Sequence, residues 1–196
     1  MCNEYARRIT PEQLRAGWGA TDAKMLFPEG ASNLPELDSI RITDLGLILR
    51  ASGTEAGAAE AVTRRWSWPG PGGKPVYNFR SEGREFGSGR CLIIADAFYE
   101  FTPQADPKAK RKHKWRFTLR DAPIFAIAGL WRTDPTVGQA FTMLTTEPGQ
   151  DVRPYHNRQI VVLPPTDFAR WLDPQVPAQE VLKPLPAGSL SVEQIC

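Results

Sequence analysis

Glycine and proline recur along the whole chain and divide it into short segments. The 196 residues include 16 glycines and 18 prolines, and the longest stretch that lacks both is 108–122. Because proline breaks helices and glycine weakens them, a chain punctuated in this way cannot form the long helices of a helical bundle. We therefore expect several short strands and few helices, joined by turns.

Apolar runs between these breakers predict the strands. They lie at 41–49, 90–95, 115–119, 124–131, 141–145 and 159–163, and a period-2 stretch covers 76–82. Loops are expected at 27–39 and 66–75, and residues 51–62 are expected to form a weak helix or an insertion.

Local capping signals predict two helices. Thr10 at the N-cap, Pro11 at the first helical position and Gln13 at the third predict a helix over 11–19. A second helix is expected over 165–172, with Thr166 as its cap.

Strands at close intervals with few helices indicate an α+β fold, a mainly antiparallel sheet that curls toward a barrel and is flanked by short helices. At roughly 100–200 residues per domain, we expect one domain over 1–196 that ends in an extended tail over about 183–196. The N-terminus has no secretory signal pattern, and no apolar run approaches the ~20 residues of a membrane helix. These features predict a cytoplasmic monomer that does not bind membranes.

Cysteine and histidine are too sparse for a metal site or a disulfide framework. The chain has three cysteines, Cys2, Cys91 and Cys196, without a CxxC spacing, and two histidines, His113 and His156. No cofactor is predicted.

The formal net charge of +2 conceals a basic middle third. Residues 61–120 contain 13 Lys/Arg and 5 Asp/Glu, and the most basic run is 108–116. Such a segment fits a polyanion-binding surface and fits equally well a solvated loop. The aromatic residues interleaved with these charges could stack on unpaired bases or belong to the core; they are Trp66, Trp68, Phe79, Phe101 and Trp115.

Cys2 is the first candidate for chemistry. The initiator methionine is normally removed when the second residue is this small, which would leave Cys2 with a free α-amine beside its thiol. With ordinary pKa values of ~8 and ~8.5, both groups can attack one aldehyde in succession and close a thiazolidine ring. The alternative is a buried, inert cysteine.

Four further polar residues could act with Cys2. His156 lies in a polar turn as either a catalytic or a solvated group. Glu100 follows Tyr99 as either a buried acid with a raised pKa or a surface acid at a strand end. Asn78 and Arg80 share one face of a period-2 stretch, where an amide and a guanidinium could orient a reactant or bind phosphate.

Ordered motifs over nearly the whole chain resemble those of the SOS response-associated peptidase (SRAP) family, whose members crosslink to abasic sites in single-stranded DNA. They are Cys2 directly after Met1, Asn-Phe-Arg-Ser-Glu at 78–82, the segment 90–101, the segments 125–131 and 141–147, and the His-x-Arg turn at 156–158.

The resemblance implies that Cys2 forms a thiazolidine with the ring-opened abasic deoxyribose. It implies that Glu100 is the acid/base, that His156 protonates the sugar oxygen, and that Asn78 orients the reacting groups. Arg80 and Arg158 would hold phosphates, while Trp66, Trp68 and Phe101 would contact DNA. Autoproteolytic removal of a residue before Cys2, lyase-type chemistry, nucleoid association on damaged DNA and replication-fork partners are implied in the same way.

The start of the chain departs from the family pattern. Many members begin Cys-Gly-Arg, whereas Asn3 and Glu4 follow Cys2 here. We expect Arg7 or Arg8 to supply the missing arginine contact to DNA, unless that contact is dispensable. The alternatives to a crosslinking enzyme are a cysteine (N-terminal nucleophile) peptidase that acts without DNA and a non-catalytic nucleic-acid-binding module.

Overall fold

Five strands close into a barrel at the centre of the computed structural model, which describes residues 2–19, 23–30, 35–106, 108 and 110–196. The barrel strands are β4 (Leu45–Ala51), β5 (Ala59–Trp66), β9 (Arg90–Ala95), β12 (Phe125–Asp134) and β13 (Gly138–Thr146). The order is β13-β12-β9-β4-β5, and a parallel pairing of β5 with β13 closes the ring. The other barrel pairings are antiparallel, which confirms the expected curled, barrel-like sheet.

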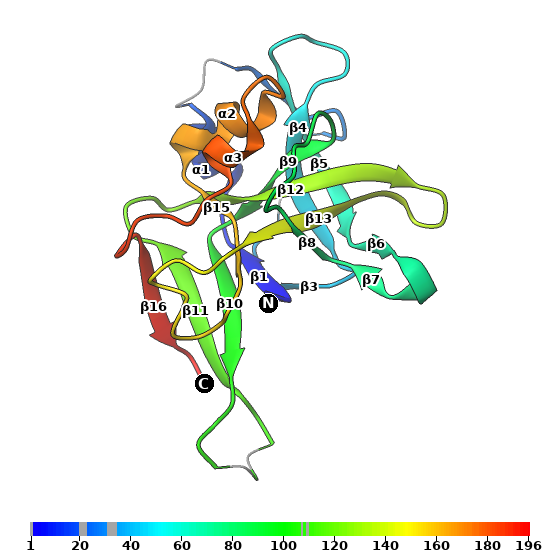
Figure 1. Cartoon of the computed structure of the whole chain (residues 1–196). Coiled ribbons are helices and arrows are strands. Elements are labelled where there is room, and N and C mark those ends of the chain that lie inside the picture. Colours follow the sequence, from blue (N-terminus) through cyan, green and yellow to red (C-terminus); the bar gives the residue numbers. More distant parts are fainter. Residues whose placement is uncertain (1, 20–22, 31–34, 107, 109) are drawn as a thin grey trace.

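A second sheet of five strands lies beside the barrel (Figure 1). Its order is β16 (Leu190–Gln194), β11 (His113–Leu119), β10 (Ala97–Thr102), β1 (Glu4–Arg7) and β3 (Leu37–Arg41). Shorter strands complete the fold: β2 (Met25–Leu26), β6 (Trp68–Pro69), β7 (Pro75–Val76), β8 (Asn78–Arg80), β14 (Gln159–Ile160) and β15 (Val162–Leu163).

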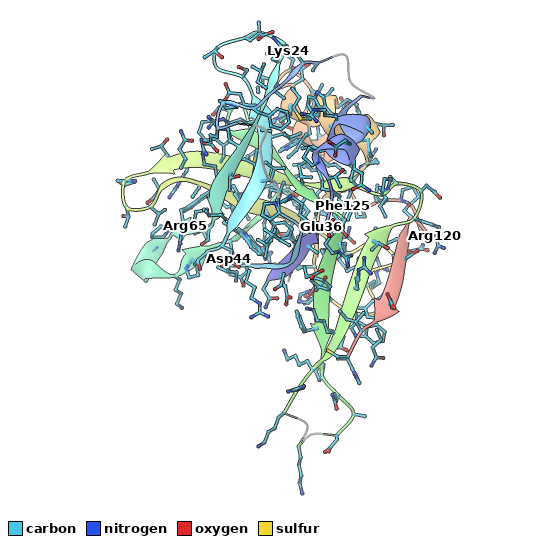
Figure 2. All side chains as sticks on the ribbon, turned by 180° about the vertical axis from the view of Figure 1, so that it is seen from behind. Lys24, Glu36, Asp44, Arg65, Arg120 and Phe125 are labelled. Atoms are coloured by element: carbon cyan, nitrogen blue, oxygen red, sulfur yellow. The ribbon has the colours of Figure 1, made fainter. Side chains whose placement is uncertain are left out.

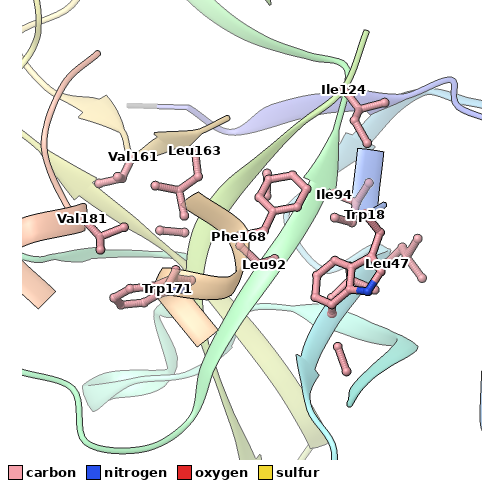
Figure 3. Close-up of a cluster of buried hydrophobic side chains, with 14 of the residues drawn as sticks. Trp18, Leu47, Leu92, Ile94, Ile124, Val161, Leu163, Phe168, Trp171 and Val181 are labelled. Carbon is pink, nitrogen blue, oxygen red and sulfur yellow. The ribbon is translucent and has the colours of Figure 1, made fainter. Parts of the chain in front are cut away.

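Strand β9 is buried on both faces, and its alternating side chains enter two separate cores. Leu92 and Ile94 face the helices, and Figure 3 shows them with Trp18, Phe168 and Trp171. These helices are α1 (Pro11–Trp18), α2 (Phe168–Leu172) and α3 (Ala178–Val181).

The other face of β9 joins the barrel to the second sheet. Cys91 and Ile93 belong to a cluster that also contains Tyr5 of β1, Phe98 of β10 and the functional candidate Cys2. The start of the chain is therefore anchored in the core between the barrel and the second sheet.

The guanidinium of Arg90 ties the barrel to the end of α2. It donates to the carbonyl oxygens of Asp173 at 2.8 Å and Val176 at 2.9 Å, and to that of Phe86 at 2.7 Å. It also lies over the ring of Trp171, 4.7 Å from its centroid.

The predicted helix at 11–19 is confirmed as α1, and its capping box forms as expected. Thr10 Oγ1 accepts from the backbone N–H of Gln13 at 3.2 Å, and Gln13 Oε1 accepts from that of Thr10 at 2.9 Å. The second predicted helix is a 3-10 turn at Pro165–Asp167 followed by α2. Asp167, not Thr166, is the N-cap of α2, and it makes no side-chain capping bond.

The predictions for 41–49, as one strand, and for 51–62, as a weak helix or an insertion, differ from the structure because tertiary pairing outweighs local composition. The expected strand 41–49 is two strands, β3 and β4, separated by a turn in which Thr43 has φ of 83°. The segment 51–62 contains no helix: residues 52–58 form a loop, and residues 59–62 begin β5, because Ala59, Ala61 and Val62 pair with β4 and fill the core.

The expected loops and the tail contain further short strands. The sequence did not predict them because glycine and proline interrupt the apolar pattern there. Strands β6 and β7 pair with each other inside the expected loop 66–75, and β3 begins inside the expected loop 27–39. Strand β16, in the tail, pairs antiparallel with β11. Among the described residues, no helix has the length and apolar character needed to span a membrane.

Candidate active site

Strand β1 places Cys2 beside the end of β10 that carries Glu100. The two strands are antiparallel, with Tyr5 opposite Phe98. Glu100 lies two residues beyond Phe98 and therefore on the same face of the sheet, which is the face that packs against the cluster containing Cys2. Both side chains are only 1% exposed. The thiol of Cys2 donates to the carbonyl oxygen of Glu4 at 3.2 Å.

Burial shifts the pKa values of both groups upward. Loss of solvation raises the pKa of the Cys2 thiol to about 12, and the negative charge of nearby Glu100 adds to the shift. Loss of solvation also raises the pKa of Glu100 to about 7, although the positively charged N-terminus acts in the opposite direction. The sequence-based expectation of a thiol with an ordinary pKa was therefore wrong, because Cys2 lies in the core.

Asn78 connects the short strand β8 to the start of the chain. Its Nδ2 donates to the carbonyl oxygen of Cys2 at 2.9 Å. Strand β8 is held in place by parallel pairing with β13, where Asn78 lies opposite Met143. The other amide atom, Asn78 Oδ1, is buried and has no hydrogen-bond partner within the described residues.

A cavity of about 480 Å³ lies next to Asn78 and exposes the remaining candidates to solvent. Its lining includes Asn78, Arg80, Thr145, His156 and Arg158. Sequence segments that lie far apart, β8, β13 and the loop 147–158, thus meet around one opening.

His156 is held in one tautomer by its own loop. Its Nδ1 accepts the backbone N–H of Arg158 at 3.0 Å, so the neutral ring carries its proton on Nε2. Partial burial lowers the pKa of His156, and the positive charges of the N-terminus and of Lys112 act in the same direction. The neutral form therefore predominates at pH 7.

The two arginines at the cavity differ in their availability. Arg158 donates to both carboxylate oxygens of Glu82 and, at 2.9 Å, to Thr145 Oγ1. Arg80 is exposed and forms no ion pair within the described residues. Arg80 can thus meet an incoming anion directly, whereas Arg158 already has a carboxylate partner.

The two tryptophans expected to contact DNA do not offer free ring faces. Trp66 is 0% exposed and donates from Nε1 to the carbonyl oxygen of Tyr77 at 2.9 Å, so the core alternative holds for it. Trp68 is also buried, and the guanidinium of Arg132 lies 4.3 Å from its ring centroid. Base stacking on these two rings was a wrong expectation. Phe101 is half-buried and keeps part of its ring accessible.

Both candidates for the arginine that the sequence lacks after Cys2, Arg7 and Arg8, already contact other parts of the fold. Arg7 is buried and donates to the carbonyl oxygen of Pro35 at 2.9 Å. Arg8 binds the carboxylate of Asp96, with an Nη2 to Oδ2 distance of 2.7 Å.

Sequence reasoning missed the partners that hold the site together. Lys114 Nζ contacts Glu4 Oε1 at 2.7 Å across 110 positions of sequence, and Glu82 reaches Arg158 across 76. The chain contains no local signal for such pairs, because only the sheet pairings bring them together. Within the described residues, no group of three or more His, Cys, Asp or Glu could hold a metal ion.

Comparisons with known proteins agree with this architecture. The family model described as SOS response associated peptidase (SRAP) matches residues 1–196. The abasic site processing protein YobE of Bacillus subtilis is 32% identical over 120 residues, which cover 57% of this chain and 53% of that protein. The abasic site processing protein YoaM of the same organism is 32% identical over 131 residues, covering 62% and 54%. The chain spans about half the length of these relatives.

Solved structures share the fold over the full chain. A crystal structure of a protein from Bordetella bronchiseptica is 25% identical, covers 100% of both chains and has a TM-score of 0.71. Another, from Bacteroides thetaiotaomicron, has a TM-score of 0.74 at 17% identity and covers 100% of this chain and 92% of that one.

Proposed function

Because the chain belongs to the SOS response associated peptidase (SRAP) family, we propose that it processes abasic sites in single-stranded DNA and crosslinks to them covalently through Cys2. The relatives named abasic site processing proteins support the substrate class. The observation that carries the chemical proposal is the placement of Cys2 between a buried acid, Glu100, and the amide of Asn78, beside an open cavity.

The crosslink forms in two steps once Met1 has been removed. Hydrolytic removal of Met1 first consumes one water and frees the α-amine of Cys2. This amine adds to the aldehyde carbon of the ring-opened sugar, and one water leaves to give an imine. The thiol then adds to the imine carbon while its proton passes to the nitrogen, which closes a thiazolidine. No oxidant or reductant is needed, and the aldehyde that would promote strand cleavage is removed.

Glu100 is the group best suited to move these protons. With its pKa raised to about 7, its carboxyl group can both accept and donate a proton near neutral pH. It can therefore accept a proton from the thiol, whose own pKa is too high for spontaneous ionisation, and return one when water leaves. Asn78 acts as a positioning residue, because its amide holds the Cys2 carbonyl next to the cavity.

His156 acts on the sugar rather than on the cysteine. In its protonated, imidazolium form it can donate the Nε2 proton to the ring oxygen of the abasic sugar, which favours the open aldehyde. We expect His156→Ala to slow crosslink formation and reversal by about a hundredfold without abolishing strand binding. The protonated fraction of His156 increases as pH falls through its lowered pKa. The rate at which the wild-type protein opens the sugar ring should therefore rise below pH ~6.5.

His156→Asn is the matched control for this prediction. An asparagine oxygen can still accept the N–H of Arg158, so the loop keeps its hydrogen bond while the Nε2 proton is lost. Time courses of adduct formation and release across pH should show both variants equally slow. Wild-type time courses for either variant would remove His156 from the mechanism.

Arg80 is the cation that we expect to meet the DNA backbone. Arg80→Glu should weaken binding to intact single-stranded DNA about tenfold, or roughly 1.4 kcal/mol, because an exposed phosphate contact becomes a repulsion. Arg80→Lys keeps the charge and should retain most of the affinity. Fluorescence anisotropy with an intact oligonucleotide measures both. Unchanged affinity for Arg80→Glu would locate the DNA path elsewhere.

A cysteine peptidase that acts without DNA is not favoured by the site. Such an enzyme needs a reactive thiolate, whereas burial raises the pKa of Cys2 to about 12. The aldehyde route needs the thiol only after the amine has already reacted.

The proposal is tested by blocking the aldehyde. The protein is incubated with a single-stranded oligonucleotide that contains one abasic site, and products are separated on a denaturing gel. We expect an adduct that is absent with an intact strand and absent when the oligonucleotide is treated with methoxyamine, which caps the aldehyde. An adduct that survives methoxyamine treatment would contradict attack at the aldehyde.

A further inference from the structure

The hairpin that joins β10 to β11 carries a cluster of exposed cations. It projects beyond the rest of the molecule (Figure 1), and side chains along it extend with no other element beside them (Figure 2). The basic arm is defined here as the exposed residues Lys108, Lys110, Arg111 and Lys112. No ion pair joins any of these four to an acidic side chain in the part of the chain that the structure describes.

The two basic residues at the base of the hairpin are different, because they stabilise the fold. Lys114 contacts Glu4 at 2.7 Å, and Arg116 Nη2 lies 3.8 Å from Asp96 Oδ2. Both are half-buried. The cations of the basic run therefore fall into two groups. Lys114 and Arg116 pair with acids of the fold, whereas those of the basic arm remain available to a partner.

The base of the hairpin adjoins the loop that carries His156. The rings of Tyr155 and Trp115 have centroids 4.7 Å apart, so the residue before His156 packs directly on β11. The charge of Lys112 contributes to the lowered pKa of His156. The arm thus begins at the edge of the candidate active site rather than on a remote surface.

Ring surfaces lie on the strands from which the arm projects. Phe101 and Trp115 are half-buried on the two strands of the hairpin. Cations that follow a backbone beside aromatic rings are typical of proteins that bind unpaired strands, because each base offers a face for stacking.

We propose that the basic arm binds phosphates of the single strand outside the cavity, beyond the nucleotides that the cavity itself holds. This inference rests on the proposed function for its ligand. The arm raises the affinity for strands long enough to reach it and leaves the chemical step at Cys2 unchanged.

The test compares two double variants that remove the same charge. Lys110→Gln/Arg111→Gln changes the arm, and Lys74→Gln/Arg120→Gln changes two exposed cations elsewhere. Lys74 lies just before β7, and Arg120 follows β11 at the end opposite the hairpin (Figure 2). The ligands are an intact long oligonucleotide, an intact trinucleotide and an intact duplex, so the binding readout does not depend on crosslinking.

We expect the arm variant to bind the long single strand more weakly, with a salt slope of log K against log [salt] smaller by about 1.4 if each cation neutralises one phosphate. The trinucleotide should bind all proteins equally, and the conservative exchange Lys110→Arg/Arg111→Lys should restore affinity. The crosslinking rate at saturating DNA should match wild type.

If the arm and control variants lost equal affinity for the long single strand, net charge alone would explain the effect and the inference would be overturned. An unchanged salt slope, or a loss confined to the duplex, would also overturn it. If wild-type protein forms no crosslink but the arm variant still loses affinity for the long strand, the proposed chemistry fails while the arm's contact with DNA stands.

Discussion

A Cys2→Ala protein is expected to form no denaturation-stable adduct with abasic single-stranded DNA, while it binds the intact strand nearly as tightly as wild type. Alanine keeps the α-amine after Met1 is removed, so the variant still forms the imine but cannot close the ring. Borohydride, which reduces imines, should therefore trap an adduct with Cys2→Ala. Denaturing gels with and without borohydride measure the separate contributions of the amine and the thiol.

Cys91→Ala provides the matched control for this variant. Both cysteines are buried in the same cluster, so truncation should destabilise the two proteins similarly. Cys91 belongs to a barrel strand and has no role in the proposed chemistry, so its variant should keep the adduct. A stable adduct with Cys2→Ala, or equal loss with Cys91→Ala, would contradict the role of the Cys2 thiol.

Glu100→Gln is expected to slow crosslinking strongly and, at alkaline pH, to stabilise the fold. Adduct formation should slow by about 10²- to 10⁴-fold, the usual contribution of a positioned acid or base, while binding of the intact strand is preserved. Stability should increase at alkaline pH, because glutamine removes the cost of keeping an ionised carboxylate almost wholly buried.

The pH dependence of that stability gain follows from the direction of the shift. The fold raises the pKa of Glu100 from 4.5 to about 7, so it favours the protonated form. This favourable contribution is complete below pH 4.5 and is lost as pH rises through 7. The gain from Glu100→Gln should therefore be small at pH 4.5 and grow to about 3 kcal/mol at pH 8.

Urea unfolding at both pH values, together with single-turnover crosslinking, measures these effects. Glu193→Gln is the control, since Glu193 is an exposed acid in the same sheet and should change neither stability nor rate by a comparable amount. Wild-type crosslinking rates for Glu100→Gln would remove Glu100 from the mechanism. An equal stability change at both pH values would contradict its raised pKa.

The parts of the fold that the sequence predicted are those with local causes. The capping box at Thr10 and Gln13 lies within one helical turn, and α1 begins where these residues indicate. The run 90–95 is apolar at nearly every position, and β9 has those same bounds because both of its faces are buried. The end of the segment 51–62 was misread because Ala59 and Ala61 gain strand structure only by pairing with β4 in the barrel.

In the candidate site, too, local motifs could be predicted, whereas features set by tertiary packing could not. Cys2, Asn78, Glu100 and His156 were named from motifs, but the choice between a surface and a buried Glu100 depended on the packing of β10. The sequence left Trp66 either as a DNA contact or as a core residue, and its ring fills the core. The carboxylate that occupies Arg158 comes from a loop 76 positions away, which no local pattern could reveal.

Intact mass spectrometry tests the central claim most directly. Wild-type and Cys2→Ser proteins are weighed alone and after incubation with a single-stranded oligonucleotide that carries one abasic site. Wild-type protein should lack the mass of Met1 and should gain one oligonucleotide less one water, in a one-to-one adduct that survives denaturation and is absent from Cys2→Ser. A correctly trimmed, folded wild-type protein that gains no mass would contradict crosslinking through Cys2.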